Sequence, residues 1–269
     1  MGSVASIRVS PGAWGGRVFV GSGWLLYSGS IGAAALHSHH ALQVLVARDG
    51  VVRITDGEGR ASSGAVVVVA PGAAHAAAAA VPSGYLLYLE PRSRAAGRIR
   101  PSGGVASPRP NAAALGALVS APEPRTLEAA RGVAIRIVGL ASRGGSDDPR
   151  RPGHASVRRA LDLLPGLIER HGSDLRLPRI AEAVGRSAEG LSRAFNDEIG
   201  MSVPAYVRWA RLRFVARSLA RGRTLTEAAQ DAGFSDGAHL SRVFRETFGI
   251  RPSELSGCAR WTVGDEALD

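Results

Sequence analysis

Three histidines and a glutamine in the N-terminal half have a spacing that suits a metal ion or a polar ligand. His37, His39 and Gln43 lie in the segment GAAALHSHHALQVLVARDG, with the spacing of alternate residues on one side of a strand. His75 follows at the start of a later predicted strand. Imidazole binds divalent metals and also hydrogen-bonds polar organic ligands. The pattern therefore allows a metal site, an organic-effector site, or three histidines that only pack in the core.

The side chains next to these histidines bear on which kind of site they form. Gln43 is a weak neutral ligand, and His40 is predicted to face the opposite side of the strand, towards solvent. A metal-dependent enzyme would need a filled histidine site with open coordination positions. Gln43 in place of a carboxylate beside the histidines argues against that class. We therefore predict no catalytic residue. We expect an effector site at His37, His39, Gln43 and His75, with a divalent metal at the three histidines as one alternative.

Short apolar runs surround the histidines and predict an antiparallel β domain. The runs lie in RVFVGSGWLLYSG, LQVLVARDGVVRITDGEGR, AVVVVAPG and GYLLYLEP, and glycine, proline or aspartate separates them. The pairs Asp49-Gly50 and Asp56-Gly57 are typical of hairpin turns. An antiparallel barrel or sandwich over residues 1–100 is the simplest assembly.

A helical linker is predicted to follow the β domain. Apolar periodicity favours helices over 111–120 and 125–142, which cover the sheet or mediate dimerisation. The segment SRGGSDDPRRPG, from Ser142 to Gly153, has the composition of an exposed linker. The predicted units are a β domain (1–100), the helical linker (101–153), an all-α domain (154–260) and a tail (261–269).

The all-α domain contains a repeated pattern. VGRS at 184–187 and LSRAF at 191–195 are matched by AGFS at 232–235 and LSRVF at 240–244. In each copy a glycine that tolerates positive φ ends one helix, and a serine, Ser187 or Ser235, is predicted to cap the next. A basic helix from Ser202 to Leu219 joins the copies, which predicts two helix-turn-helix units.

Exposed polar residues near the start of each second helix are candidates for reading DNA. A helix-turn-helix places its second helix in the major groove, where arginine pairs bidentately with guanine. Arg193 and Arg242 occupy the same position in the two copies and are the strongest candidates for base contact. The predicted DNA-contacting residues are Glu189, Ser192, Arg193, Arg208, His239, Ser241, Arg242 and Arg245.

Two longer segments carry a family resemblance. These are LRLPRIAEAVGRSAEGLSRAFNDEIGMSVPAYV over the first unit and GFSDGAHLSRVFRETFGIRPSEL over the second. Through them, residues 155–257 resemble the DNA-binding domain of the AraC/XylS family of bacterial transcriptional regulators. The resemblance implies an α+β two-domain protein, in which an antiparallel, cupin-like β barrel senses an effector and a tandem helix-turn-helix domain binds DNA. Gln43 stands where metal-binding cupins commonly carry glutamate, and Gly190, Gly237 and Ala238 replace larger polar groups, so DNA shape is expected to supply part of the specificity.

Charge and composition agree with this interpretation. The net charge is +10 and all 33 basic residues are arginine, which favours a polyanionic partner. The lone Cys258 points to a reducing compartment, and no apolar run has the length of a membrane span, so we expect a cytoplasmic protein that does not bind membranes.

The expected partners are double-stranded DNA, a small-molecule or metal effector, RNA polymerase and a second copy of the chain. We expect a transcription factor and not an enzyme. The alternative is a metal-dependent cupin enzyme that carries a DNA-binding appendage.

Overall fold

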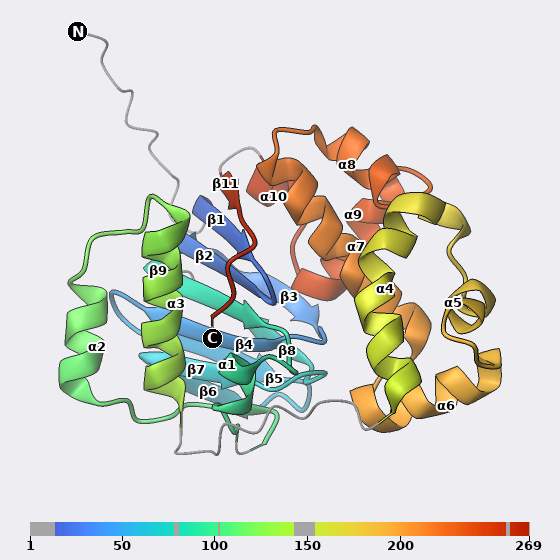
Figure 1. The fold of residues 1–269 in the computed structure, drawn as a ribbon. Coiled ribbons are helices and arrows are strands. Elements are labelled where there is room, and N and C mark those ends of the chain that lie inside the picture. Colours follow the sequence, from blue (N-terminus) through green and yellow to red (C-terminus); the bar gives the residue numbers. More distant parts are fainter. Residues whose placement is uncertain (1–13, 78–80, 102, 143–153, 257–258, 269) are drawn as a thin grey trace, which may run out of the picture.

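The computed structural model describes residues 14–77, 81–101, 103–142, 154–256 and 259–268 (Figure 1). A β domain with helices against one face lies beside a helical domain, which confirms the predicted α+β arrangement. Residues 143–153, which make up most of the exposed connector predicted from Ser142 to Gly153, fall outside the described ranges. Within these ranges, no helix combines the length and the apolar character needed to cross a membrane.

The β domain contains a seven-stranded sheet in the order β10-β7-β4-β9-β2-β1-β11 and a four-stranded sheet in the order β3-β8-β5-β6. The strands are β1 (Gly15–Gly21), β2 (Trp24–Ile31), β3 (Ala34–His37), β4 (Leu42–Ala47), β5 (Val52–Asp56), β6 (Ala61–Gly64), β7 (Val66–Val69), β8 (His75–Ala77), β9 (Val81–Leu89), β10 (Val105–Ala106) and β11 (Ala259–Val263). Neighbouring strands pair antiparallel, apart from the parallel pair β1 and β11. The predicted antiparallel β domain is therefore confirmed.

Two predicted helices cover the larger sheet, with one packed directly on its strands and the other beside it. They are α2 (Ala112–Val119) and α3 (Leu127–Ala141), which follow the short helix α1 (Arg94–Gly97). Ala134 and Ile137 of α3 are fully buried in one core with Phe19 and Leu87 of the sheet. This helical segment is therefore packed on the β domain through its apolar face.

The helical domain has two similar helix pairs on either side of a long helix. Its elements are α4 (Ala155–His171), a 3-10 turn (Gly172–Asp174), α5 (Leu177–Ala183), α6 (Ala188–Ile199), α7 (Val203–Ala220), α8 (Leu225–Asp231), α9 (Gly237–Phe248) and α10 (Pro252–Ser256). Leu191 and Phe195 of α6, and Leu240 and Phe244 of α9, are buried in the common core. The pairs α5–α6 and α8–α9 are the two predicted helix-turn-helix units, and α7 joins them.

The N-terminal caps of α6 and α9 lie at positions that differ by one residue between the two copies. Ser187 accepts the backbone N–H of Gly190 at 3.1 Å, which confirms the predicted cap of α6. The predicted cap of α9 was wrong, because the side chain of Asp236, and not that of Ser235, accepts the N–H of His239 at 2.6 Å. The second copy has one more residue before its leucine, so its helix begins one residue later.

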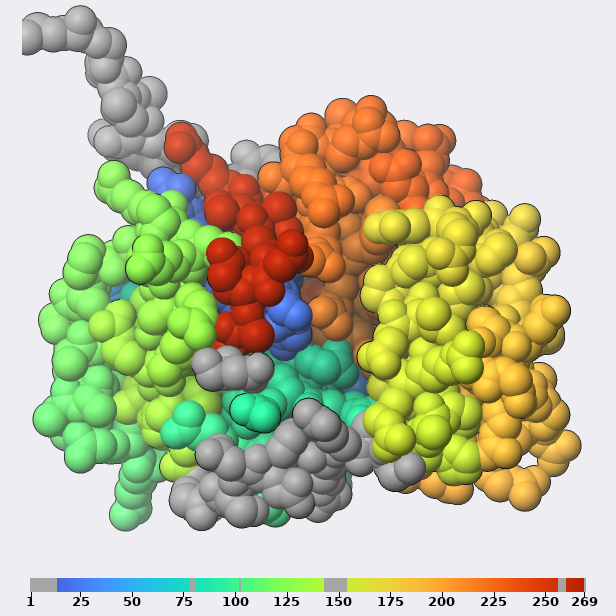
Figure 2. Space-filling view, in the orientation of Figure 1, coloured from blue at the N-terminus to red at the C-terminus, as the bar shows by residue number. Residues whose placement is uncertain are grey.

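The C-terminal segment returns from the helical domain to the sheet. β11 pairs with β1, the backbone N–H of Gly264 donates to Val20 at 3.0 Å, and the Trp24 indole donates to the carbonyl of Glu266 at 2.8 Å. Figure 2 shows this segment, in red, on the surface between the β domain and the helical domain. The sequence assigned only a tail to residues 261–269.

Candidate effector site and DNA-reading helices

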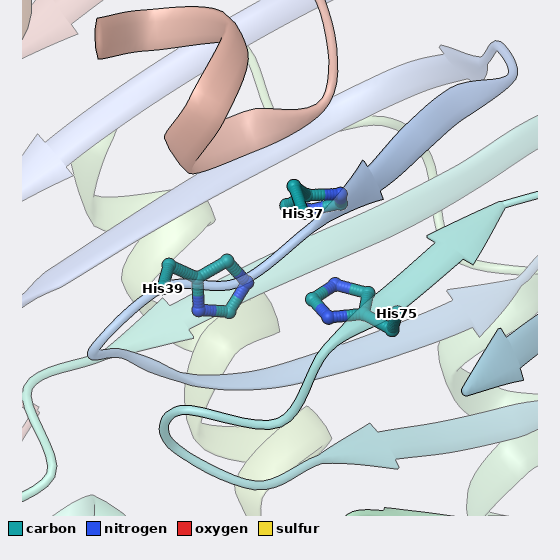
Figure 3. A group of neighbouring side chains, drawn as sticks. All are labelled: His37, His39 and His75. Atoms are coloured by element: carbon teal, nitrogen blue, oxygen red, sulfur yellow. The ribbon is translucent and has the colours of Figure 1, made fainter. Parts of the chain in front are cut away.

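His37, His39 and His75 converge inside the β domain (Figure 3). The ring centroids of His37 and His75 lie 4.1 Å apart, and that of His39 lies 5.0 Å from His75 and 5.7 Å from His37. All three side chains are buried, and one ring nitrogen from each lies within 4.8 Å of the other two. The structure thus brings together the three histidines that the sequence grouped.

A backbone carbonyl orients each of these imidazoles. The Nδ1 atoms lie 2.8 Å, 3.0 Å and 2.9 Å from the carbonyl oxygens of Ala35, Ala41 and Ala73, for His37, His39 and His75 in turn. Because a carbonyl oxygen only accepts, Nδ1 carries the proton in the neutral ring and Nε2 keeps its lone pair. The Nε2 atoms of His37 and His75 are buried and have no hydrogen-bond partner among the described residues.

Gln43 lies beside the third Nε2 atom. Its Oε1 is 3.3 Å from His39 Nε2, and its Nε2 is 3.0 Å from the hydroxyl of Tyr88. The two amide ends are exchanged by a half-turn of the group, so Gln43 can donate to an unprotonated His39 while it accepts from Tyr88. Gln43 therefore holds His39 and Tyr88 together.

Burial keeps the cluster neutral at physiological pH. Desolvation, and then the nearby imidazole of His75, lower the pKa of His37 to about 4. The same causes, with a further contribution from His37, lower the pKa of His39 to about 3, and desolvation lowers the pKa of His75. Neutral imidazole is the form that binds a metal ion.

Two expectations about this region were wrong. His37, His39 and Gln43 do not share one strand, since β3 ends at His37, β4 begins at Leu42, and His39 lies in the loop between them. His40 is buried instead of solvated, with its Nε2 3.4 Å from Glu90 Oε1. Glu90 also accepts from Arg213 at 3.2 Å, so His40 belongs to a polar contact between the β domain and α7.

The second recognition helix ends against the histidine strand. The backbone N–H of Ala35 in β3 donates to the carbonyl of Gly249 at 2.9 Å, directly after α9. Gly249 has φ +72°, and a Cβ at this position would lie 2.7 Å from His37 Nδ1. No local sequence pattern predicts this contact, because it joins residues far apart in the chain.

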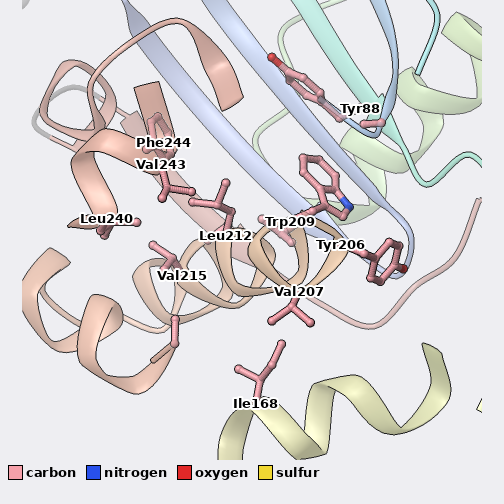
Figure 4. Close-up of a cluster of buried hydrophobic side chains, with 14 of the residues drawn as sticks. Tyr88, Ile168, Tyr206, Val207, Trp209, Leu212, Val215, Leu240, Val243 and Phe244 are labelled. Carbon is pink, nitrogen blue, oxygen red and sulfur yellow. The ribbon is translucent and has the colours of Figure 1, made fainter. Parts of the chain in front are cut away.

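Aromatic side chains extend this contact between α9 and the histidine cluster. The ring of Phe248 in α9 packs edge-on against that of Tyr88, with 5.7 Å between the ring centroids, and its centroid lies 6.2 Å from that of Trp209. Tyr88 and Trp209 in turn lie 5.2 Å and 6.5 Å from His39. Figure 4 shows Tyr88 and Trp209 in the cluster that also contains Phe244.

The predicted DNA-contacting residues lie on the two recognition helices and on α7. Arg193, Arg242 and Arg245 are exposed, and Arg193 forms an ion pair with the exposed Glu189 at 3.0 Å. Ser192, His239 and Ser241 are half-buried. The exposed Arg208 of α7 borders a groove that His239 also lines, so these two residues lie at the junction of the two units.

An apolar cavity of about 70 Å³ lies between the two domains. Trp14, Trp24 and Leu86 line it from the β domain, and Leu212 and Phe248 line it from α7 and α9. Glu90 and Arg213 supply its polar edge.

The helical domain matches a known family model, and part of the chain matches curated proteins. Residues 180–257 match a family model described as a helix-turn-helix domain. The transcriptional activator NphR of Rhodococcus sp is 36% identical over 103 residues, which cover 36% of this chain and 30% of that protein. The HTH-type transcriptional activator RhaR of Pectobacterium atrosepticum is 30% identical over 129 residues, or 48% of this chain and 45% of that protein. The chain thus spans less than half the length of these curated relatives.

Solved structures match over both domains. An apo variant of ToxT from Vibrio cholerae aligns with 88% of this chain and 98% of that chain, with a TM-score of 0.60 and 14% identity, which shows the fold. ToxT in a structure with bound unsaturated fatty acid aligns with 87% and 95%, with a TM-score of 0.56 and 14% identity. These matches define a helix-turn-helix protein with an N-terminal β domain. The helical domain thus resembles the DNA-binding domain of AraC/XylS-family regulators, as the sequence predicted.

Proposed function

We propose that the protein is a sequence-specific DNA-binding transcription factor that responds to an effector bound by its N-terminal domain. The observation that carries the proposal is the equivalent, exposed position of Arg193 and Arg242 on two recognition helices of one chain. The named relatives are transcriptional activators, which supports the same function and argues against an enzyme.

The two recognition helices enter successive major-groove segments on one face of the DNA, about one helical turn apart. Arg193 and Arg242 read base edges there, together with Glu189 and His239. Arg208 binds a phosphate between the two segments, since it lies at the junction that DNA must cross to reach both helices. Ser192, Ser241 and Arg245 complete the predicted contacts.

The effector site is formed by His37, His39, Gln43 and His75. Its support is the buried convergence of three neutral imidazoles beside the end of α9. Effector binding then changes the free energy of DNA binding through the helical domain.

The apolar cavity between the domains is a second candidate effector site. Its lining of tryptophan, leucine and phenylalanine suits an apolar ligand, and a ToxT structure of the same fold carries a bound unsaturated fatty acid. The cavity has room for only a few non-hydrogen atoms as it stands, so a longer ligand would have to separate the domains.

RNA polymerase and a second copy of the chain are the further partners we propose, in the cytoplasm. The relatives' names as activators support RNA polymerase as a partner. The apolar helix α2 supports a homodimer, because most of its residues are exposed and only Leu118 is buried.

Selection of bound sequences from a random DNA library by the full chain tests the DNA-binding function. We expect an asymmetric site with two conserved boxes about one helical turn apart. Salt-sensitive binding with no enriched sequence would overturn the proposal, because it would reduce the arginines to a charged patch.

A further inference from the structure

The histidine cluster has the donor arrangement of a metal site. Each Nδ1 is held by a backbone carbonyl, so the neutral rings keep their lone pairs on Nε2; those of His37 and His75 have no partner among the described residues, and that of His39 faces the Gln43 amide. Such second-shell hydrogen bonds to the other ring nitrogen are what fix histidine ligands around metals. Without a ligand, the Nε2 atoms of His37 and His75 stay buried and unpartnered, which is costly for polar groups.

The size of the space between the rings decides which kind of ligand fits. One nitrogen from each ring lies within 4.8 Å of the other two. Three nitrogens that bind one zinc ion at about 2.1 Å lie about 3.4 Å apart, so small side-chain movements close the site around an ion.

We infer that His37, His39 and His75 bind one divalent transition-metal ion through their Nε2 atoms, and that this ion is an effector that acts on the second recognition helix. The effector role of the ion rests on the proposed function, whereas metal binding by the three histidines does not. Three neutral imidazoles suit zinc, nickel, copper or iron, and not the oxygen-binding ions magnesium and calcium. The Gln43 amide and water are the remaining ligands available, and the site lacks the carboxylate that Gln43 replaces.

The contacts of β3 explain how ion binding at the cluster would affect α9. His37 ends β3, and Ala35 of the same strand donates to the carbonyl of Gly249. When His37 moves towards His75 to bind the ion, β3 moves with it and the end of α9 must follow. Phe248 and Tyr88 provide a second contact, since Tyr88 is held to His39 through Gln43.

Metal binding by the full chain tests the site independently of DNA. The purified protein is stripped with chelator, loaded with Zn²⁺ or Co²⁺, and analysed for bound metal and for the visible absorption of bound Co²⁺. We expect one equivalent, which falls below a tenth in His39→Gln and His75→Gln and is retained in His171→Gln, a histidine of α4 outside the cluster. Less than a tenth of an equivalent in the native chain, or retention in the cluster variants, would overturn the inference.

Circular dichroism shows whether the two cluster variants fold. If they do not fold, the Co²⁺ spectrum of the native chain decides, because nitrogen ligands in a four-coordinate site give a strong visible band that aquo-Co²⁺ lacks. Absence of both that band and bound metal in the native chain would contradict a three-histidine site.

The affinity of the protein for a library-selected DNA site, measured with and without Zn²⁺, tests whether metal binding acts on α9. We expect a change of at least about fivefold, and the affinity for Zn²⁺ should change by the same factor when DNA is bound. One equivalent of metal with unchanged DNA affinity would make the site purely structural and would overturn its role as an effector site. Loss of sequence-specific binding under both conditions would instead overturn the proposed function, while the metal stoichiometry would still stand.

Discussion

The two helix-turn-helix units are alike in sequence but differ in what lies at the end of their recognition helices. Gly200 ends α6 with φ +76° and has open space around its Cα, where a Cβ would meet no atom within 4 Å. Gly249 ends α9 with φ +72°, and a Cβ there would meet His37 and Ala35. The first unit is thus free of the β domain at this point, whereas the second is attached to the histidine strand. On the proposed function, the difference would let an effector at the histidine cluster act on α9 without acting directly on α6.

The largest expected effect comes from removing a core phenylalanine from either unit, which tests whether the fold depends equally on both. Phe195→Ala and Phe244→Ala each remove a large side chain from the core, and we expect each to cost about 3–5 kcal/mol in the free energy of unfolding. Chemical denaturation measures this. A cost below about 1 kcal/mol for either variant would mean that its recognition helix is not held by the core packing described above.

Metal loading would test the histidine cluster, which, among the described residues, contacts the second helix-turn-helix unit and not the first. If the histidines bind Zn²⁺, an excess of one hundred times the dissociation constant should stabilise the folded chain by about 2.7 kcal/mol. Thermal unfolding with Zn²⁺ and with chelator measures the difference, and His171→Gln serves as the control. An unchanged melting temperature in the native chain would contradict a metal site that is formed only in the folded protein.

Substitution of the paired arginines would test their equivalence. Arg193→Ala and Arg242→Ala should each lose about 1–3 kcal/mol of discrimination between the selected DNA site and a site altered at one base. Equilibrium binding to the two DNAs measures the loss. Arg208→Ala is the matched control, since a phosphate contact should weaken binding to both DNAs alike. An equal loss of affinity for both DNAs in the paired arginine variants would show that they too bind only phosphates.

The helix-ending glycines provide the sharpest test of the comparison. Gly200→Ala and Gly249→Ala both force alanine into a left-handed conformation, which costs about 1–2 kcal/mol. Gly249→Ala should cost more, because its Cβ would overlap the carbonyl oxygen of Ala35. Only Gly249→Ala should also alter metal affinity, because its Cβ meets His37. Chemical denaturation and metal titration of both variants measure the two effects. Equal metal affinities in the two variants would show that α9 is not coupled to the cluster.

The smallest expected effect concerns the start of α9. Asp236→Ala should lower the melting temperature more than Ser235→Ala, since Asp236 accepts the N–H of His239. This hydrogen bond, and the next from Ser235, lower the pKa of Asp236 in the folded protein. Its stabilisation is therefore present above the unfolded pKa of about 3.9 and is lost as the pH falls through the folded value. A larger effect of Ser235→Ala would restore the cap predicted from the sequence.

Local patterns in the sequence were sufficient to predict the helical domain. The periodic apolar residues, the capping Ser187 and the glycine at 233 predicted both helix-turn-helix units, because each of these features acts within a few residues. The grouping of His37, His39 and His75 was also predicted. The reason given for it was only partly right, since His39 lies in the loop after β3.

Long-range contacts could not be predicted in the same way. The contact of His40 with Glu90, the pairing of β11 with β1 and the hydrogen bond from Ala35 to Gly249 each join distant segments. No local period or turn motif specifies such partners, because the packing of segments far apart in the chain decides them.

The most direct test of two DNA-reading units in one chain is the library selection repeated with Arg193→Ala and Arg242→Ala in the full protein. We expect each variant to relax the sequence preference in a different one of two boxes about one helical turn apart, while the other box is retained. Loss of preference in the same box, or in neither, would contradict the assignment of α6 and α9 as separate DNA-reading helices.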